Sequence, residues 1–182
     1  MTRLLHLKGV ALVRGGRLLI DQLDLTVREG EAVHVTGING SGKSSLLRLI
    51  AGLLQPVEGS IEQSPAALAD DLSALDRELP LCRALDFWTA RDSGEALARF
   101  GLVHLAHIPV RLLSTGQLKR ATLARVAASG APLWLLDEPF NALDRDGTAR
   151  LEQAIADHRE RGGAVIAASH LAPAGTWREL GL

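Results

Sequence analysis

The sequence is poor in aromatic and sulfur-containing side chains. It contains no tyrosine, three phenylalanines, three tryptophans and one cysteine, Cys82. A single cysteine excludes an internal disulfide, and a chain without disulfides suits a reducing compartment. With so few rings, a strong aromatic stacking platform is not expected.

Long apolar runs and an excess of either charge are also missing. Apolar residues make up 47% of the chain, but the longest run, residues 131–136, holds a proline and falls far short of the ~20 residues of a membrane-spanning helix. The apolar part of the N-terminus is too short for a secretory signal. Lys plus Arg number 20 and Asp plus Glu 21, a net charge of −1, whereas proteins that grip nucleic acid are usually basic. We therefore expect a compact cytosolic chain with no nucleic-acid partner.

Residues 37–44 read Gly-Ile-Asn-Gly-Ser-Gly-Lys-Ser and match the phosphate-binding pattern G-x-x-x-x-G-K-[ST]. The apolar residues 32–36 before them read as a buried strand. After them, apolar residues recur at helical spacing until Gly52. A strand, a glycine loop and a helix in this order are the context that the motif requires.

The residue types of this loop explain its chemistry. Glycines let the backbone curl so that its N–H groups point at phosphate oxygens, and the start of the helix adds positive charge. Lys43 would reach the β- and γ-phosphates, and the Ser44 hydroxyl would ligate Mg²⁺. The sequence therefore predicts a nucleoside triphosphate bound with Mg²⁺ by Gly37, Ile38, Asn39, Gly40, Ser41, Gly42, Lys43, Ser44 and Ser45.

No repeat, low-complexity tract or linker divides the chain, so residues 1–182 are predicted to form one domain. Strands are expected within residues 3–36, broken by turns at 14–17 and 28–31, and at 57–62, 132–137 and, last, 164–168. Helices are expected from Ser64 to about Gly101, with Asp70 and Ser93 as caps, and at 117–129 and 146–161. The alternation predicts an α/β fold with a mostly parallel sheet, an N-terminal antiparallel part and a helical subdomain at roughly 64–130.

The apolar strand at 133–136 ends in two acids, Asp137 and Glu138. Carboxylates at the C-terminal end of a buried parallel strand lie where such sheets bind ligands. Asp137 can hold the Mg²⁺ shell while Glu138 points at the attacking water. Many strands simply end in solvated acids, but the phosphate loop and the abrupt turn at Pro139 favour the functional interpretation.

A second candidate phosphate contact is the run Leu113-Ser114-Thr115-Gly116-Gln117, which opens a basic helix. N–H groups and a hydroxyl at a helix start can meet phosphate. By itself such a run is an ordinary helix cap.

These motifs, in this order, resemble those of the nucleotide-binding subunit of ABC transporters over essentially the whole chain. The phosphate loop comes first and Leu-Ser-Thr-Gly-Gln stands for the signature. Leu-Leu-Asp-Glu-Pro follows as the acidic strand, Asn141-Ala142-Leu143-Asp144 as the D-loop and Ser169-His170 as the switch histidine. The resemblance implies a P-loop NTPase of the ABC type that hydrolyses ATP with Mg²⁺.

The resemblance also implies a head-to-tail homodimer that sandwiches two ATP molecules. Each ATP would lie between one subunit's phosphate loop and the partner's signature, formed by Ser114, Thr115, Gly116 and Gln117. Asp144 would communicate across the interface. His170 would bond the γ-phosphate and, together with Glu138, hold the attacking water.

The chain departs from the family pattern at three places. Val13 occupies the position where the family usually places an aromatic residue that stacks on adenine, so weak ATP binding and poor discrimination against GTP are expected. Thr115 replaces a signature glycine. The Q-loop glutamine, which couples nucleotide to the membrane partner, has no clear counterpart: Gln63 comes too early, and residues 69–73 occupy the expected region.

Residues 108–113, 131–140 and 162–166 are similar to the ATPase of the bacterial cytochrome c maturation system. That resemblance implies membrane-spanning permease partners and a peripheral position on the cytoplasmic face of the inner membrane. It also implies that ATP hydrolysis drives haem export or release of a haem-loaded chaperone. No Cys-x-x-Cys-His indicates haem handling by this chain itself. Two alternatives remain: the ATPase of a different transporter, and a non-transport ABC protein that acts on nucleic acid or ribosomes.

Overall fold

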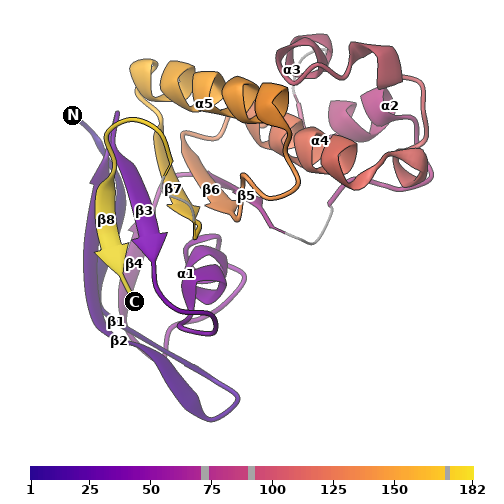
Figure 1. Cartoon of the computed structure of the whole chain (residues 1–182). Coiled ribbons are helices and arrows are strands. Elements are labelled where there is room, and N and C mark those ends of the chain that lie inside the picture. Colours follow the sequence, from indigo (N-terminus) through magenta and orange to yellow (C-terminus); the bar gives the residue numbers. More distant parts are fainter. Residues whose placement is uncertain (71–73, 90–92, 171–172) are drawn as a thin grey trace.

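The computed structural model describes residues 1–70, 74–89, 93–170 and 173–182. Figure 1 shows two sheets side by side, with a group of helices on one side and a long β-hairpin projecting away from them. The arrangement confirms the predicted α/β class with an antiparallel N-terminal part and a parallel core.

The antiparallel sheet contains β1 (Arg3–Arg14), β2 (Arg17–Arg28) and β4 (Glu58–Gln63), in the order β2-β1-β4. β1 and β2 form the projecting hairpin, whose last pair is Arg14 with Arg17. The turn between them needs glycine, because Gly15 and Gly16 have φ values of 56° and 75°. The turn predicted at residues 14–17 is thereby confirmed.

The parallel sheet has the order β5-β6-β7-β3-β8. Its strands, taken in that order, are Ala66–Ala69, Leu133–Asp137, Ala164–Ala168, Ala32–Thr36 and Arg178–Gly181. All neighbouring strands run parallel. The segments that follow β3, β6 and β7 therefore begin at the same edge of the sheet, which is where parallel sheets bind ligands.

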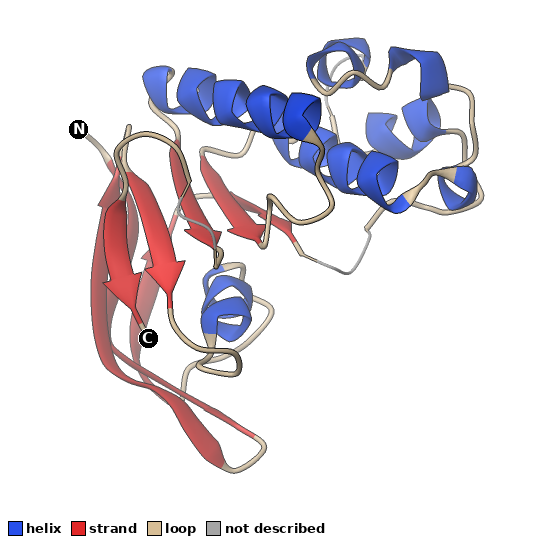
Figure 2. Cartoon of the chain, in the orientation of Figure 1, coloured by secondary structure: helices blue, strands red, loops and turns tan. Residues whose placement is uncertain are grey.

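Side-chain alternation along β6 divides the core into two layers. Leu133 and Leu135 pack with α1 (Lys43–Ile50) and the antiparallel sheet, whereas Trp134 and Leu136 pack with α4 (Thr115–Ala128) and α5 (Arg145–Glu160). Figure 2 shows α1 on one side of the parallel strands and the longer helices on the other. The parallel sheet is thus covered on both faces, as its nearly continuous apolar strands require.

A helical segment lies between β5 and β6 in the chain. It contains α2 (Leu81–Asp86), α3 (Gly94–Arg99), the short 3₁₀ turns η1 (Val103–Leu105) and η2 (Val110–Leu112), and α4. Its own core is built around fully buried Phe100, Leu81, Leu85 and Leu102.

Two expectations about secondary structure are wrong. Residues 66–69 form strand β5 rather than helix, although alanine favours helices, because β5 pairs with β6. The capping role predicted for Asp70 falls on residues 71–73, which lie outside the described residues; the Asp70 carboxylate pairs with Arg48 at 3.2 Å. Strand β7 is not the last, since the short, largely exposed β8 follows it and pairs with β3.

Ser93 precedes α3, as the capping prediction requires, but makes no side-chain cap bond to it. Its hydroxyl instead donates to the Cys82 carbonyl oxygen at 3.3 Å. This bond ties the start of α3 to α2.

Candidate functional site

The phosphate-loop sequence forms a tight loop between β3 and α1. Gly37 has no room for a side chain: a Cβ there would lie 2.6 Å from the Ser41 Oγ and 2.7 Å from the Leu182 carbonyl oxygen. Gly42 caps α1 with a φ of 115°, a conformation that L side chains rarely adopt. The glycines of the motif are therefore required by the backbone path of the loop.

Lys43 is the first residue of α1, and its side chain turns back over the loop. The ammonium donates to the carbonyl oxygens of Gly37 at 2.8 Å and Ile38 at 3.2 Å, and the residue is only 8% exposed. The positive charge is thus held inside the loop, next to the N-terminus of α1. Together they make a site for anionic oxygen.

A cleft of about 560 Å³ opens beside the loop. It brings together segments that are far apart in the sequence: the hairpin, the phosphate loop, and the turns after β6 and β7. It is lined by Arg14, Leu19, Asn39, Gly40, Gly42, Lys43, Ser44, Ser45, Glu138, Asn141 and His170.

Six of the nine predicted loop residues and both predicted catalytic residues therefore line one cleft. Ile38 points outward and is 79% exposed, while the Ser41 Oγ is buried inside the loop with no hydrogen-bond partner among the described residues.

Glu138 and His170 face each other across the cleft. The His170 Nε2 lies 3.5 Å from Glu138 Oε1, and the two side chains are 51% and 23% exposed, respectively. Glu138 has a φ of 42°, unusual for a residue with a side chain, and its N–H donates to the Ala168 carbonyl oxygen at 2.8 Å. Such strain persists only where the surroundings impose it.

Oxygen donors for a divalent cation stand at the same edge. Ser44 lines the cleft, and Asp137, only 7% exposed, precedes Glu138 at the end of β6. Mg²⁺ is usually held by one or two protein oxygens plus phosphate oxygens and water. A hydroxyl and a carboxylate beside a phosphate loop therefore fit Mg²⁺.

The signature run forms the exposed start of α4. Ser114 and Gln117 make a reciprocal capping box: the Gln117 N–H donates to the Ser114 hydroxyl at 3.3 Å, and the Ser114 N–H donates to the Gln117 side chain at 2.9 Å. Ser114 and Thr115 are exposed. None of the four signature residues lines the cleft.

The D-loop packs under the signature. A Cβ at Gly116 would lie 2.9 Å from the Ala142 carbonyl oxygen, so the two segments touch through their backbones. Asp144 caps α5 by accepting a hydrogen bond from the Gly147 N–H at 2.8 Å. Asp144 is therefore held at the base of α5.

Asp70 and Arg125 join the helical segment to the sheet at the end of β5. Asp70 pairs with Arg48 of α1, and Arg125 of α4 donates to the Leu68 carbonyl oxygen. Burial lowers the pKa of Arg125, and the charge of Asp70 partly offsets this. The region where the Q-loop glutamine was expected includes residues 71–73, which lie outside the described residues.

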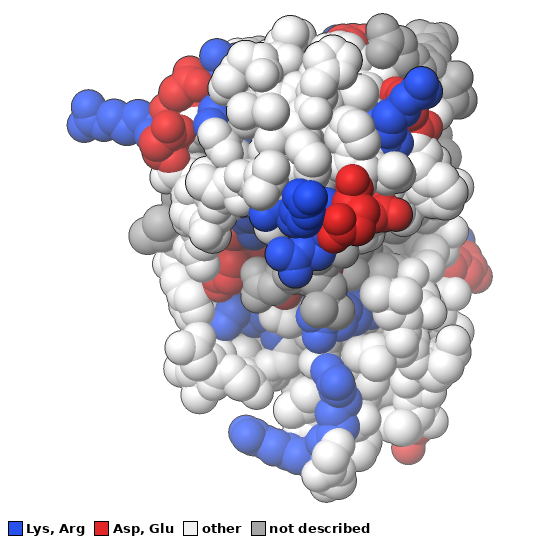
Figure 3. Space-filling view, turned by 90° about the vertical axis from the view of Figure 1, so that its right-hand side faces the viewer, with Lys and Arg blue, Asp and Glu red and all other residues white. Residues whose placement is uncertain are grey.

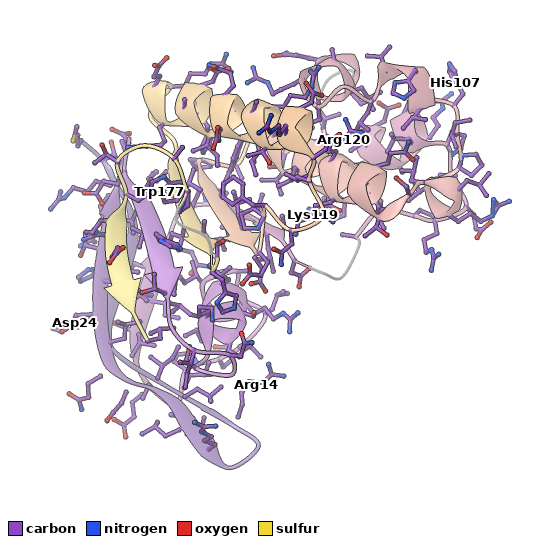
Figure 4. All side chains as sticks on the ribbon, in the orientation of Figure 1. Arg14, Asp24, His107, Lys119, Arg120 and Trp177 are labelled. Atoms are coloured by element: carbon purple, nitrogen blue, oxygen red, sulfur yellow. The ribbon has the colours of Figure 1, made fainter. Side chains whose placement is uncertain are left out.

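Reasoning from the sequence missed three side chains at or near the cleft. Arg14 and Leu19 line it, and the Lys119 ammonium donates at 3.0 Å to the backbone oxygen of Asp137. Asn141, predicted only as part of the D-loop, also lines the cleft. Figure 4 shows Arg14 near the loop that leads into α1 and Lys119 near the end of β6.

The placement of Val13 in the cleft is wrong, since Val13 is not among the residues that line it, whereas Arg14 is. Register shifts on β1 between Val10 and Leu12 and between Leu12 and Val13 alter the alternation of side chains. The sequence could therefore not tell which of the two neighbours faces inward.

Comparisons with known proteins agree with this geometry. The ABC transporter family model matches residues 20–141. Solved structures with the same fold include an ATP-binding subunit of an ABC transporter, with a TM-score of 0.84 at 22% identity over 92% of this chain and 80% of that one. A putative ABC transporter ATP-binding protein from Pyrococcus furiosus has a TM-score of 0.82 at 21% identity and covers 98% and 96%. The chain belongs to the ABC transporter family, in which it is an ATP-binding protein.

Its similarity to curated relatives is more specific. The cytochrome c biogenesis ATP-binding export protein CcmA of Sphingopyxis alaskensis is 54% identical over 94% of this chain and 92% of its own length. The protein of that name from Novosphingobium aromaticivorans is 56% identical and covers 88% and 85%. Within the ABC family the chain groups with the CcmA proteins, and its activity is ATP hydrolysis coupled to transport.

Proposed function

We propose that this chain is the ATPase subunit that powers the cytochrome c biogenesis transporter, driving haem export or release of a haem-loaded chaperone. The observation that carries the chemistry is the single cleft on which the phosphate loop, Glu138 and His170 converge. The similarity to CcmA proteins over nearly the whole chain supports the biological setting.

ATP binds with its triphosphate along the loop. Lys43 and the N–H groups at the start of α1 contact the β- and γ-phosphates. Ser44 and Asp137 would hold Mg²⁺, and the ion would supply positive charge to stabilise the phosphate oxygens.

Hydrolysis takes place at the end of the cleft where Glu138 and His170 stand. Glu138 accepts a proton from water as the water oxygen bonds to the γ-phosphorus. The bond between the γ-phosphorus and the β–γ bridging oxygen breaks, and ADP leaves with that oxygen. His170 hydrogen-bonds the γ-phosphate and holds the water. Lys119 fixes the backbone of Asp137 just before the base, so we assign it a positioning role.

A second copy of the chain completes each site. The signature residues are exposed and lie away from the cleft of their own chain, which suits a role in a neighbour's site. One structural neighbour, 24% identical with a TM-score of 0.81, is a dimeric ATP-binding cassette in a post-hydrolysis state with ADP and phosphate. We infer a head-to-tail homodimer in which Asp144 lies at the interface.

Membrane-spanning partners select the cargo. No helix in the described part of the chain combines the length and apolar character of a membrane span. We infer that the subunit is peripheral and is held at the cytoplasmic face of the inner membrane by permease components. It has no nucleic-acid partner in this proposal, consistent with its net charge of −1.

The test is formation of c-type cytochromes in a strain whose own gene is replaced by the wild type or by Glu138→Gln. We expect covalently bound haem in c-type cytochromes to disappear with Glu138→Gln while the protein still accumulates. An unchanged cytochrome level would instead favour the ATPase of a different transporter. A pull-down from detergent-solubilised membranes would then identify the partner.

A further inference from the structure

The nucleotide cleft has two chemically different ends. Glu138 and His170 stand at one end, where the γ-phosphate reacts. At the other end the wall is made by Arg14 and Leu19 of the β1–β2 hairpin. The Arg14 guanidinium lies 3.4 Å from the Ser45 hydroxyl, just past the Mg²⁺ ligand Ser44.

A triphosphate whose γ end is at Glu138 directs its nucleoside toward this second end. In phosphate loops the lysine reaches the β- and γ-phosphates, and the backbone around it cradles the α- and β-phosphates. The base then leaves the loop past Ser45, where Arg14 and Leu19 meet it. Leu19 lies against the loop: its Cβ is 3.4 Å from the position that a Cβ on Gly42 would take.

Arg14 is available for a ligand. Its one hydrogen bond within the described residues is the long contact to Ser45, and it forms no ion pair there. Figure 3 shows basic side chains at the lower end of the face turned toward the viewer, over the projecting hairpin. The flat, weakly hydrated guanidinium is a group that stacks on ring faces.

We propose that Arg14 is the base-facing residue of the nucleotide site and stacks its guanidinium plane on the purine, with Leu19 beside it. The assignment rests on the proposed nucleotide site. Tryptophan and phenylalanine are absent from the described lining of the cleft, so the guanidinium takes the place of an aromatic ring. Nucleic-acid bases stack on arginine planes in the same way.

Leu19 argues for the base rather than for a phosphate as the neighbour of Arg14. A charged phosphate oxygen beside Leu19 would lose hydrating water and gain no hydrogen bond from the aliphatic side chain, which is unfavourable. The apolar face of a base can be buried there without that cost. Lys43 and the start of α1 already supply positive charge for the phosphates. Because every purine offers a π-face, the stack adds affinity without distinguishing adenine from guanine.

The experiment is calorimetric titration of the full chain with Mg-ATP, Mg-GTP and Mg-tripolyphosphate, which has no base. Arg14→Ala should weaken both nucleotides about fivefold, the factor expected of a partly exposed cation–π contact, and leave tripolyphosphate unchanged. Arg14→Lys keeps the charge but loses the plane and should behave like Arg14→Ala. Arg14→Tyr restores a plane without charge and should recover nucleotide binding. Arg17→Ala, across the same turn, is the matched control and should change nothing.

Two results would overturn the assignment. Equal weakening of ATP and tripolyphosphate by Arg14→Ala, with recovery in Arg14→Lys, would make Arg14 a phosphate ligand. Unchanged ATP binding in Arg14→Ala would remove it from the site. The Lys43→Ala variant tests the proposed nucleotide site separately from the role of Arg14. Retained tripolyphosphate binding in Lys43→Ala would contradict the proposed nucleotide site.

Discussion

The parallel sheet and the helical segment carry their proposed functional residues in opposite ways. In the sheet, the phosphate loop and Glu138 follow buried strands, and backbone hydrogen bonds fix where each begins. In the helical segment, the signature is an exposed helix start, and large apolar side chains such as Phe87 and Leu112 are 81% and 65% exposed.

This difference indicates that the two regions have different roles, one in the chemistry on phosphate and the other in contacts with other chains. Chemistry on phosphate requires groups held to within fractions of an ångström, which a buried sheet edge provides. Contacts with other chains require surface, which the helical segment offers. The following variants are designed to separate the two regions, in order of decreasing effect.

Glu138→Gln should abolish most of the ATP hydrolysis assigned to the edge of the parallel sheet and leave nucleotide binding intact. Removal of a general base typically costs 10²–10⁴-fold in rate, so we expect hydrolysis to fall by about that factor. Binding of Mg-ATP should persist. Light scattering should show more dimer, because the ATP held between the two subunits is not hydrolysed and the dimer therefore does not separate. An unchanged hydrolysis rate would contradict the role assigned to Glu138.

Gly116→Ala should impair the contribution of the signature to hydrolysis by the dimer, without changing nucleotide binding in the cleft of its own chain. The added Cβ would lie 2.9 Å from the Ala142 carbonyl oxygen, so the signature must shift relative to the D-loop. A misplacement of about 1 Å can cost about 10²-fold, and we expect a loss of ten- to a hundredfold in hydrolysis by the dimer. ADP binding, measured by calorimetry, should be unchanged. Loss of ADP binding would mean that the signature serves its own chain.

Arg125→Met tests the joint between the two regions. Arg125 is 5% exposed, donates to the Leu68 carbonyl oxygen and lies 4.8 Å from the centre of the Trp88 ring. Leaving that carbonyl unpaired should lower the free energy of unfolding by about 2 kcal/mol in urea denaturation. Arg83→Ala, an exposed arginine on α2, is the control and should be neutral. Equal stability of the two variants would show that the joint contributes nothing.

His158→Phe should reduce the pH dependence of stability. Burial lowers the pKa of His158, which stacks on Trp134 with ring centroids 4.0 Å apart. A folded state that resists protonation loses stability as pH falls below the unfolded value of about 6.5. The drop in Tm between pH 7.5 and 5.5 should therefore be smaller in His158→Phe, by a few degrees. Identical drops would exclude His158 as the titrating group.

The motifs themselves could be predicted from sequence because each is a local pattern with its own chemistry. The phosphate loop, the acidic end of β6 and the capping box at Ser114 all depend on neighbours in the chain. Strand β5 could not be recognised, because three alanines and a leucine form a strand only when β6 is there to pair with them.

The side chains that complete the cleft depend on tertiary register. Whether Val13 or Arg14 faces inward is decided by irregular pairing on β1. The contact of Lys119 with Asp137 requires α4 to pack at the end of β6. No local sequence pattern predicts either arrangement.

The left-handed backbone conformation of Glu138 lowers the stability of the fold at the position that the proposed activity requires to be glutamate. A φ of 42° costs a side-chain-bearing residue about 1–2 kcal/mol, and asparagine tolerates the conformation better. Selection for heat resistance alone would therefore tend to replace the proposed catalytic base by asparagine. Thermostable variants of this protein should accordingly be chosen by turnover, with position 138 held fixed.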